Sequence, residues 1–188
     1  MGILVNFFKK PETFISKLPK EYQYLGKMDI APILREALKE YGVMEFKNGS
    51  NPVIIKWADE IGGWIDQYYT DDSIPWCGLF MAVCAKRAGY PHGQKALSAV
   101  NWLSWGSAVT QPAMGDVLVF KRNGGGHVGL YVGEDTTHFH VLGGNQADSV
   151  CITRIEKTRL QGIRRQPNYK GGKRVILAGN GKTSYNEA

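Results

Sequence analysis

The chain has 188 residues, of which 43% are apolar and 21% are charged, the balance of an ordinary globular domain with its own core. Lys and Arg outnumber Asp and Glu by 23 to 17, and this positive charge favours a polyanionic partner such as nucleic acid, an anionic membrane or an anionic cell wall. The sequence has no helix-turn-helix, zinc-finger or RNA-recognition motif, which argues against nucleic acid, and its longest apolar run, residues 77–85, is too short to span a membrane.

Composition divides the chain into three parts. Residues 1–27 mix apolar and basic side chains around two prolines, and we expect them to form an N-terminal extension outside the core. Residues 28–166 carry the periodic patterns of a folded domain, whereas residues 167–188 are polar, basic and glycine-rich and predict a flexible tail. The apolar residues 2–8 lack the preceding basic region of a signal peptide, so we expect synthesis and retention in the cytoplasm until another factor carries or releases the protein.

The predicted elements follow in chain order, helices first. Apolar residues recur at helical spacing in four segments, each followed by a glycine: residues 30–41, 53–61, 75–88 and 99–105. For the third helix, Asp71–Ser73 offer N-cap chemistry and Pro75 suits the first turn. The period then changes to two, which predicts strands at residues 117–120, 127–132, 139–142 and 150–154. Helices followed by an antiparallel sheet make an α+β fold.

Cys77 and His127 are the candidate reactive pair. Cys77 begins the apolar helical segment, where unpaired N–H groups and the helix dipole favour a thiolate. His127 opens the second strand fifty residues later, and an imidazole there could serve as general base. Cys84 lies two helical turns further on with no base of its own, and Cys151 lies within a predicted strand, so we assign both to the core. Three cysteines without regular spacing predict no disulfide framework.

A third residue is needed to orient the imidazole and fix its tautomer. Asn145 follows the next strand within Gly143–Gln146 and is the first candidate, while His140 on the preceding strand is the alternative. His138 and His140 share a strand face, but no CxxC or HExxH pattern completes a metal site. The glycine-rich residues 124–129 lead into a strand rather than a helix, so they predict no dinucleotide site. We therefore expect neither a metal nor a cofactor.

Five short motifs together resemble the CHAP and NlpC/P60 superfamily, and more narrowly a phage-associated branch of cell-wall hydrolases. The resemblance covers roughly residues 30 to 166, and its motifs are Pro75–Cys77, Ser104–Gly106, Gly115–Val117, Gly126–Gly129 and Leu142–Gln146. It implies a papain-like fold, with N-terminal helices packed on an antiparallel sheet. It also implies cleavage of peptidoglycan amide bonds, by an endopeptidase or an N-acetylmuramoyl-L-alanine amidase.

The resemblance assigns Cys77 as nucleophile, His127 as base and Asn145 as the polar third residue. NlpC/P60 enzymes usually place a histidine third and an aspartate directly before the nucleophile. Here Trp76 precedes Cys77, and Asn145 fits the CHAP pattern better.

The implied partner is bacterial peptidoglycan, on which the positive charge would help hold the protein. Trp76, Trp102 and Trp105 are candidates for a groove that binds sugar or peptide, although tryptophans in a small domain also serve as core. The N-terminal extension could dock on phage tail proteins, so both a free endolysin and a tail-associated lysin remain open.

Two other functions fit the same motifs. One is a virion structural protein that keeps the hydrolase fold without activity. The other is acyl transfer or deamidation of a protein on the same fold. The presence of both Cys77 and His127 favours an enzyme over the first.

Overall fold

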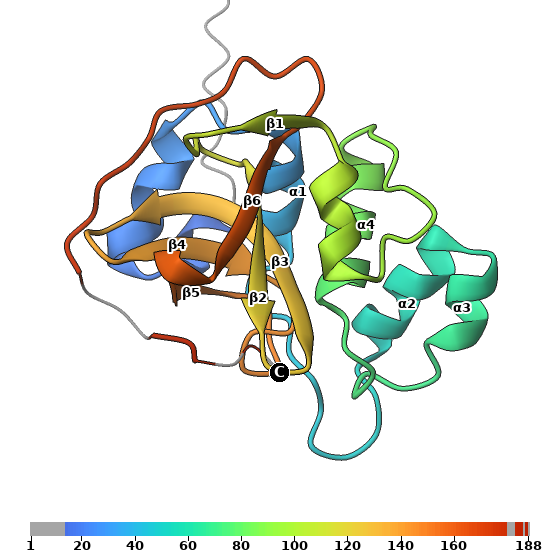
Figure 1. Cartoon of the computed structure of the whole chain (residues 1–188). Coiled ribbons are helices and arrows are strands. Elements are labelled where there is room, and N and C mark those ends of the chain that lie inside the picture. The colour runs from blue at the N-terminus through green and yellow to red at the C-terminus, as the bar shows by residue number, and fades with distance from the viewer. Residues whose placement is uncertain (1–13, 180–182, 186, 188) are drawn as a thin grey trace, which may run out of the picture.

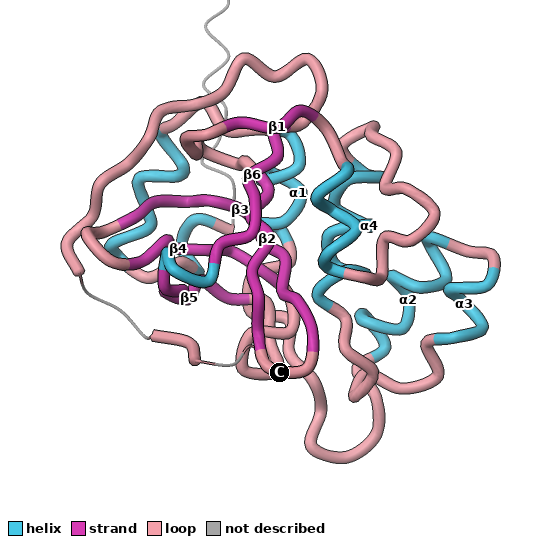
Figure 2. Tube along the Cα trace, in the orientation of Figure 1, coloured by secondary structure: helices cyan, strands magenta, loops and turns pink. Residues whose placement is uncertain are grey.

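The computed structural model describes residues 14–179, 183–185 and 187, and they form an α+β fold as predicted. Figures 1 and 2 show a strongly twisted sheet with the N-terminal helices behind it and three further helices to its right. The helices are η1 (Ile15–Lys17), η2 (Lys20–Lys27), α1 (Pro32–Lys39), α2 (Pro52–Ile61), α3 (Trp64–Tyr68), α4 (Cys77–Arg87), η3 (Ala99–Ser104) and η4 (Lys157–Arg159), where η denotes a 3-10 helix.

The sheet is antiparallel throughout, with the strand order β1-β6-β2-β3-β4-β5. The strands are β1 (Ser107–Val109), β2 (Val117–Arg122), β3 (Gly125–Glu134), β4 (His138–Gly143), β5 (Cys151–Glu156) and β6 (Leu160–Arg165). The four predicted strands correspond to β2 to β5. The tight connection at Asn123–Gly124 joins β2 to β3, and Phe120 pairs with His127 near this end of the hairpin.

Strand β3 is buried on both faces because apolar layers cover the sheet from two sides. Val128, Leu130 and Val132 point into the main core, which α1 and α4 complete. Tyr131 points to the opposite face, where it joins a second cluster that includes Phe120. Successive side chains of a strand alternate between faces, so His127 lies on the same face as Tyr131. Packing on both faces holds β3 in place, and with it His127 near its start.

Helix α4 begins later than predicted. Its first residue is Cys77, and no side chain caps it. Asp71 instead accepts a hydrogen bond from the backbone N–H of Ser73 (2.8 Å), and Asp72 accepts one from Asn51 (2.7 Å). The prediction of an N-cap at Asp71–Ser73 is therefore wrong: these carboxylates close turns that lead to the helix, and Cys77 itself stands at the uncapped end.

The predicted N-terminal extension belongs to the core over its described part. Phe14, Leu18, Tyr22 and Leu25 are buried against the main core, because their three- to four-residue spacing places them on one side of η1 and η2. The basic residues between them face solvent, which is why the pattern read as an extension. Residues 1–13 lie outside the described residues, as does any docking role predicted for them.

The predicted flexible tail is also attached where it is described. The backbone N–H of Glu134 donates to the carbonyl of Val175 (2.9 Å), and that of Leu177 donates to Glu134 (2.8 Å). Val175 and Leu177 pack against the main core. Two backbone hydrogen bonds to Glu134 and two apolar side chains therefore hold this part of the C-terminal segment, although its composition predicted a flexible tail. Within the described residues, no helix combines the length and apolarity needed to cross a bilayer.

Candidate active site

The thiol of Cys77 lies at the start of α4, against the beginning of β3. Cys77 is 5% exposed. Burial raises the pKa of the thiol, whereas Arg122 and the backbone N–H groups of Val128 and Gly78 act in the opposite direction. Because the N–H of Val128 reaches the sulfur, the thiol sits at the backbone of the residue that follows His127. The structure thus brings the predicted nucleophile and base to the same end of β3.

His127 supplies one bonded and one unpaired ring nitrogen. Its Nε2 lies 3.0 Å from the side-chain oxygen of Gln146, and its Nδ1 is buried without a hydrogen-bond partner. No hydrogen bond joins Nδ1 to the Cys77 sulfur. Burial lowers the pKa of His127 to about 4, so the imidazole is neutral at pH 7 and keeps a lone pair on Nδ1.

The amide of Gln146 fixes which imidazole nitrogen carries the proton. Its Nε2 donates to the carbonyls of Val141 (3.2 Å) and Cys151 (2.6 Å), on β4 and β5. Carbonyl oxygens accept only, so the NH₂ end must face them and Oε1 must face His127. The His127 Nε2 therefore donates to Oε1, which assigns Nδ1 as the basic nitrogen.

The amide that bonds His127 is one position away from the predicted Asn145. Asn145 is buried in the β4–β5 connection with a φ of 55°, but among the described contacts it makes no hydrogen bond with His127. Gln146 makes that bond instead. Two adjacent amides follow Gly143–Gly144 in an irregular loop, where no side-chain period says which of them faces the strand, so the sequence alone offered no means of choosing.

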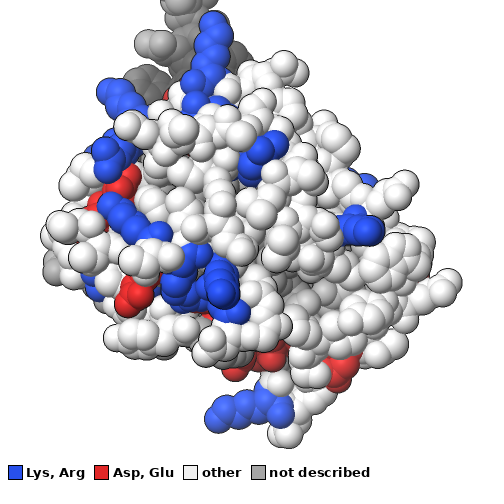
Figure 3. Space-filling model, viewed as in Figure 1, with Lys and Arg blue, Asp and Glu red and all other residues white. Residues whose placement is uncertain are grey.

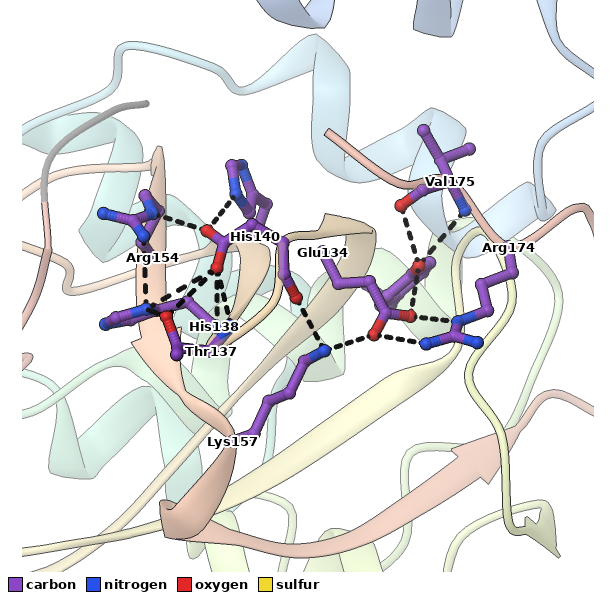
Figure 4. Close-up of polar contacts among 10 residues, drawn as sticks. Glu134, Thr137, His138, His140, Arg154, Lys157, Arg174 and Val175 are labelled. Carbon is purple, nitrogen blue, oxygen red and sulfur yellow. Dashed lines mark hydrogen bonds and ion pairs between the residues drawn. The ribbon is translucent and has the colours of Figure 1, made fainter. Parts of the chain in front are cut away.

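His140 is not the orienting residue either. Its Nδ1 bonds the Tyr22 hydroxyl (2.7 Å) and its Nε2 bonds Asp135 (3.0 Å), so both nitrogens are used away from His127. Figure 4 shows His140 within a charged cluster in which Arg154 approaches the same carboxylate. Burial acts to raise the pKa of Asp135, but Arg154 and backbone N–H groups hold it far below its ordinary range. His140 is a structural residue.

Glycine lets the orienting loop rest directly on the nucleophile's helix. A Cβ atom at Gly144 would lie 2.6 Å from Cβ of Phe80 and 2.7 Å from the ring of Trp76, closer than real side-chain contacts allow. Close packing of Gly144 against Trp76 and Phe80 therefore fixes the distance between α4 and the loop that carries Gln146. Gly78 serves similarly, since its own added Cβ would collide with the carbonyls of Ala96 and Leu97.

The three predicted substrate-binding tryptophans are largely core residues. Their exposed fractions are 0% for Trp76, 1% for Trp102 and 8% for Trp105. Each indole N–H is already bonded, to Glu45, to the Ala96 carbonyl and to the Pro91 carbonyl respectively. Trp76 cannot touch a substrate in this conformation because none of it is exposed, which corrects the prediction. Trp102 and Trp105 do line a cavity of about 530 Å³, where their role stays a prediction.

Arg122 was missed by the sequence reasoning. Its Nε donates to the carbonyl of Gly126 (3.2 Å), and its charge acts to lower the pKa of both Cys77 and His127. A strand-end arginine carries no motif, and only the β2–β3 pairing brings it to the reactive pair.

Within the described ranges, no group of three His, Cys, Asp or Glu side chains is arranged to hold a metal ion. Neither the scan against protein-family models nor the search of curated proteins finds a match to this chain. The resemblance to the CHAP and NlpC/P60 superfamily therefore stays a prediction that rests on the motifs alone.

Proposed function

We propose that this chain is a papain-like cysteine hydrolase that cleaves an amide bond in the stem peptide of peptidoglycan. One observation carries the proposal: Gln146 fixes the His127 tautomer so that the unpaired Nδ1 is the basic nitrogen, at the end of β3 where the backbone N–H of the next residue, Val128, reaches the Cys77 thiol. A buried imidazole nitrogen without a partner costs folding free energy. A general base requires such a free nitrogen, so this cost agrees with a catalytic role for His127.

The chemistry follows from this arrangement. The Cys77 proton passes to Nδ1 of His127 as the sulfur attacks the peptide carbonyl carbon. The resulting imidazolium returns its proton to the leaving amine as the C–N bond breaks, which leaves a thioester. Water then gives a proton to His127 and attacks the thioester, and the thiol is restored as the carboxylate product departs.

The start of α4 supports the charged intermediate. No side chain caps this helix, so its first N–H groups are free to donate. The backbone N–H of Cys77 is the donor we assign to the oxyanion, and the helix dipole adds to its effect. Tyr69 lies close enough to interact electrostatically with Cys77, but its hydroxyl donates to the Pro75 carbonyl (2.7 Å) and so shapes the wall of the site.

The choice of peptidoglycan rests on the family resemblance and on charge. Figure 3 shows that Lys and Arg side chains on this face lie mainly over the sheet, with few over α2 and α3. A basic surface would hold the enzyme on an anionic wall, so we place its action there, whether it is released on lysis or carried on a virion.

Mass analysis of a peptidoglycan digest tests the proposal. Purified sacculi are incubated with the wild-type protein, with Cys77→Ala and with Cys84→Ala, which removes a buried thiol from the same helix. We expect new muropeptide ends from the wild type and Cys84→Ala but none from Cys77→Ala. New termini within the stem peptide identify an endopeptidase, and a freed L-alanine terminus identifies an amidase. Sacculi left unchanged by the folded wild type would overturn the proposal.

A further inference from the structure

A buried carboxylate from a distant part of the chain lies beside the candidate active site. Glu187 is fully buried and its two oxygens bond Nη1 (2.8 Å) and Nη2 (2.6 Å) of Arg159. This two-point geometry is the strongest form of an arginine–carboxylate contact. Burying a carboxylate without such a partner would be prohibitively costly, so Arg159 makes a place suited to a carboxylate.

The pair is anchored at the end of the sheet that carries His127. Nε of Arg159 donates to the backbone carbonyl of Lys121 (3.0 Å), and Lys121 pairs with Gly126, directly before His127. Burial acts to raise the pKa of Glu187, but Arg159 and His127 outweigh it and lower the pKa. The Glu187 carboxylate is thus near enough to His127 to favour the protonated form of its imidazole.

Arg159 is held by the sheet and not only by Glu187. The bond to Lys121 fixes the guanidinium plane from β2, so its outer two nitrogens point the same way whichever carboxylate they bind. The covering segment, which we define as residues 183–185 and 187, makes further contacts with the two arginines. Arg154 bonds Thr183 (3.1 Å), the N–H of Ser184 donates to the Arg154 carbonyl (2.9 Å), and Nη1 of Arg159 donates to the Ser184 carbonyl (3.3 Å). Displacing this segment would leave the Arg159 site formed and open.

We propose that Arg159 forms a carboxylate-binding subsite beside His127. This subsite takes a free carboxylate of an acidic peptide substrate, and Glu187 fills it in this structure. The inference rests on the proposed function, since it takes Cys77 as the reacting atom. It names the substrate class more narrowly: a peptide with a free carboxylate a short distance from the bond that is cut. The covering segment then competes with the substrate for the same arginine.

Affinity labelling of Cys77 tests the subsite without any cell wall. Iodoacetyl compounds that end in a carboxylate are compared with their carboxamide counterparts, using glycine, β-alanine and γ-aminobutyrate spacers. Alkylation rates at Cys77 are followed by peptide mass mapping, which separates this thiol from Cys151. The proteins are the wild type, Glu187→Gln, and Glu187→Gln combined with Arg159→Ala, Arg159→Lys or Arg87→Ala. Arg87 is the matched control because it pairs with Glu40 and Glu60, on the helices.

With at least one spacer, we expect Glu187→Gln to increase the carboxylate-over-carboxamide preference about 5-fold or more over wild type. Adding Arg159→Ala should abolish that preference, Arg159→Lys should retain only part of it, and Arg87→Ala should leave it unchanged. If Arg159→Ala unfolds, the comparison with Arg159→Lys tests the subsite instead, because lysine keeps the positive charge but cannot bind a carboxylate through two nitrogens. A preference that is absent with every spacer, or unchanged by both Arg159 variants, overturns the subsite. Either result is independent of whether the protein digests sacculi.

Discussion

Two histidines on neighbouring strands illustrate two ways to bury an imidazole. His140 on β4 uses both nitrogens, toward Tyr22 and Asp135. His127 on β3 uses one, toward the neutral amide of Gln146, and leaves the other unpaired. An unpaired atom alone proves little, since Nε2 of His138 is also buried without a partner. What distinguishes His127 is the thiol beside the next residue's N–H.

The difference extends to the two ends of β3. At its last residue, Glu134 bonds Lys157 (2.6 Å) and Arg174 (2.6 Å), so that end is closed by ion pairs, as Figure 4 shows. At its start, Arg122, Arg159 and Glu187 act on His127 through their charges, but the ring itself bonds only the neutral amide of Gln146 among the described contacts. We infer that the Glu134 end of this strand stabilises the fold, whereas the His127 end keeps an unpaired ring nitrogen for reaction. The predictions below test that division.

The largest expected effect is on activity at His127. Replacing His127 by Ala should lower the hydrolysis rate by about 10³-fold or more, because it removes the general base, with a smaller loss of unfolding free energy than His140→Ala because His127 makes one hydrogen bond and His140 makes two. His140→Ala should do the reverse: it leaves Tyr22 and Asp135 unpaired and should cost about 1–3 kcal/mol of unfolding free energy, while the rate per folded molecule stays within a few-fold. Turbidity clearing and thermal unfolding measure the two quantities. A large rate loss in folded His140→Ala would contradict the assignment of His127 to catalysis and His140 to stability.

The next effect is on acid stability at the other end of the strand. Burial acts to raise the pKa of Glu134, but Arg174, Lys157 and Tyr131 outweigh it and lower the pKa to about 2. A carboxyl whose folded pKa is lowered stabilises the fold above its unfolded value of about 4.5, and that contribution disappears as the pH falls toward 2.

We therefore expect wild type to exceed Glu134→Gln by about 2 kcal/mol in unfolding free energy at pH 6, after discounting for the half-exposed Arg174. The gap should narrow steadily between pH 4.5 and pH 2. Urea denaturation at a series of pH values measures it. A gap that is constant with pH would mean that packing, rather than charge, accounts for the difference.

The smallest of the three effects separates Gln146 from Asn145. Gln146→Ala should lower the rate by roughly 10- to 100-fold, because His127 loses the partner that sets its tautomer. Asn145→Gly is the matched control: glycine tolerates the positive φ at this position, and we expect less than a 3-fold change. Steady-state rates on solubilised muropeptides decide. Equal losses in both variants would restore Asn145 to the site.

The sequence predicted most of the fold because most elements carry a clean period. Helix α4 and strands β2 to β5 have regular apolar spacing, and they appear where predicted within a few residues. Strand β6 was missed because Gly162 and the pair Arg164–Arg165 interrupt its alternation. It forms by pairing with β2 and β1, and such non-local partners are invisible in a local pattern.

The site was predicted where its residues begin a helix or a strand, and not where they lie in loops. Cys77 and His127 sit at element starts, where chain position determines their placement. Gln146 lies in a loop whose course depends on Gly144 and on carbonyls from two strands. Glu187 is held near the site by its ion pair with Arg159, far away in the sequence. Tertiary contacts of that kind leave no trace in composition, which is why the last residues were read as a loose tail.

The contact at Gly144 has a consequence for anyone who would engineer this protein. Since even one methyl group there would separate the loop from Phe80 and Trp76, it would move base and nucleophile apart in a single step. A randomised library at this position should return glycine alone, while the solvent-facing Ala147, three residues on, offers a place where loop chemistry can be varied without disturbing the reactive pair.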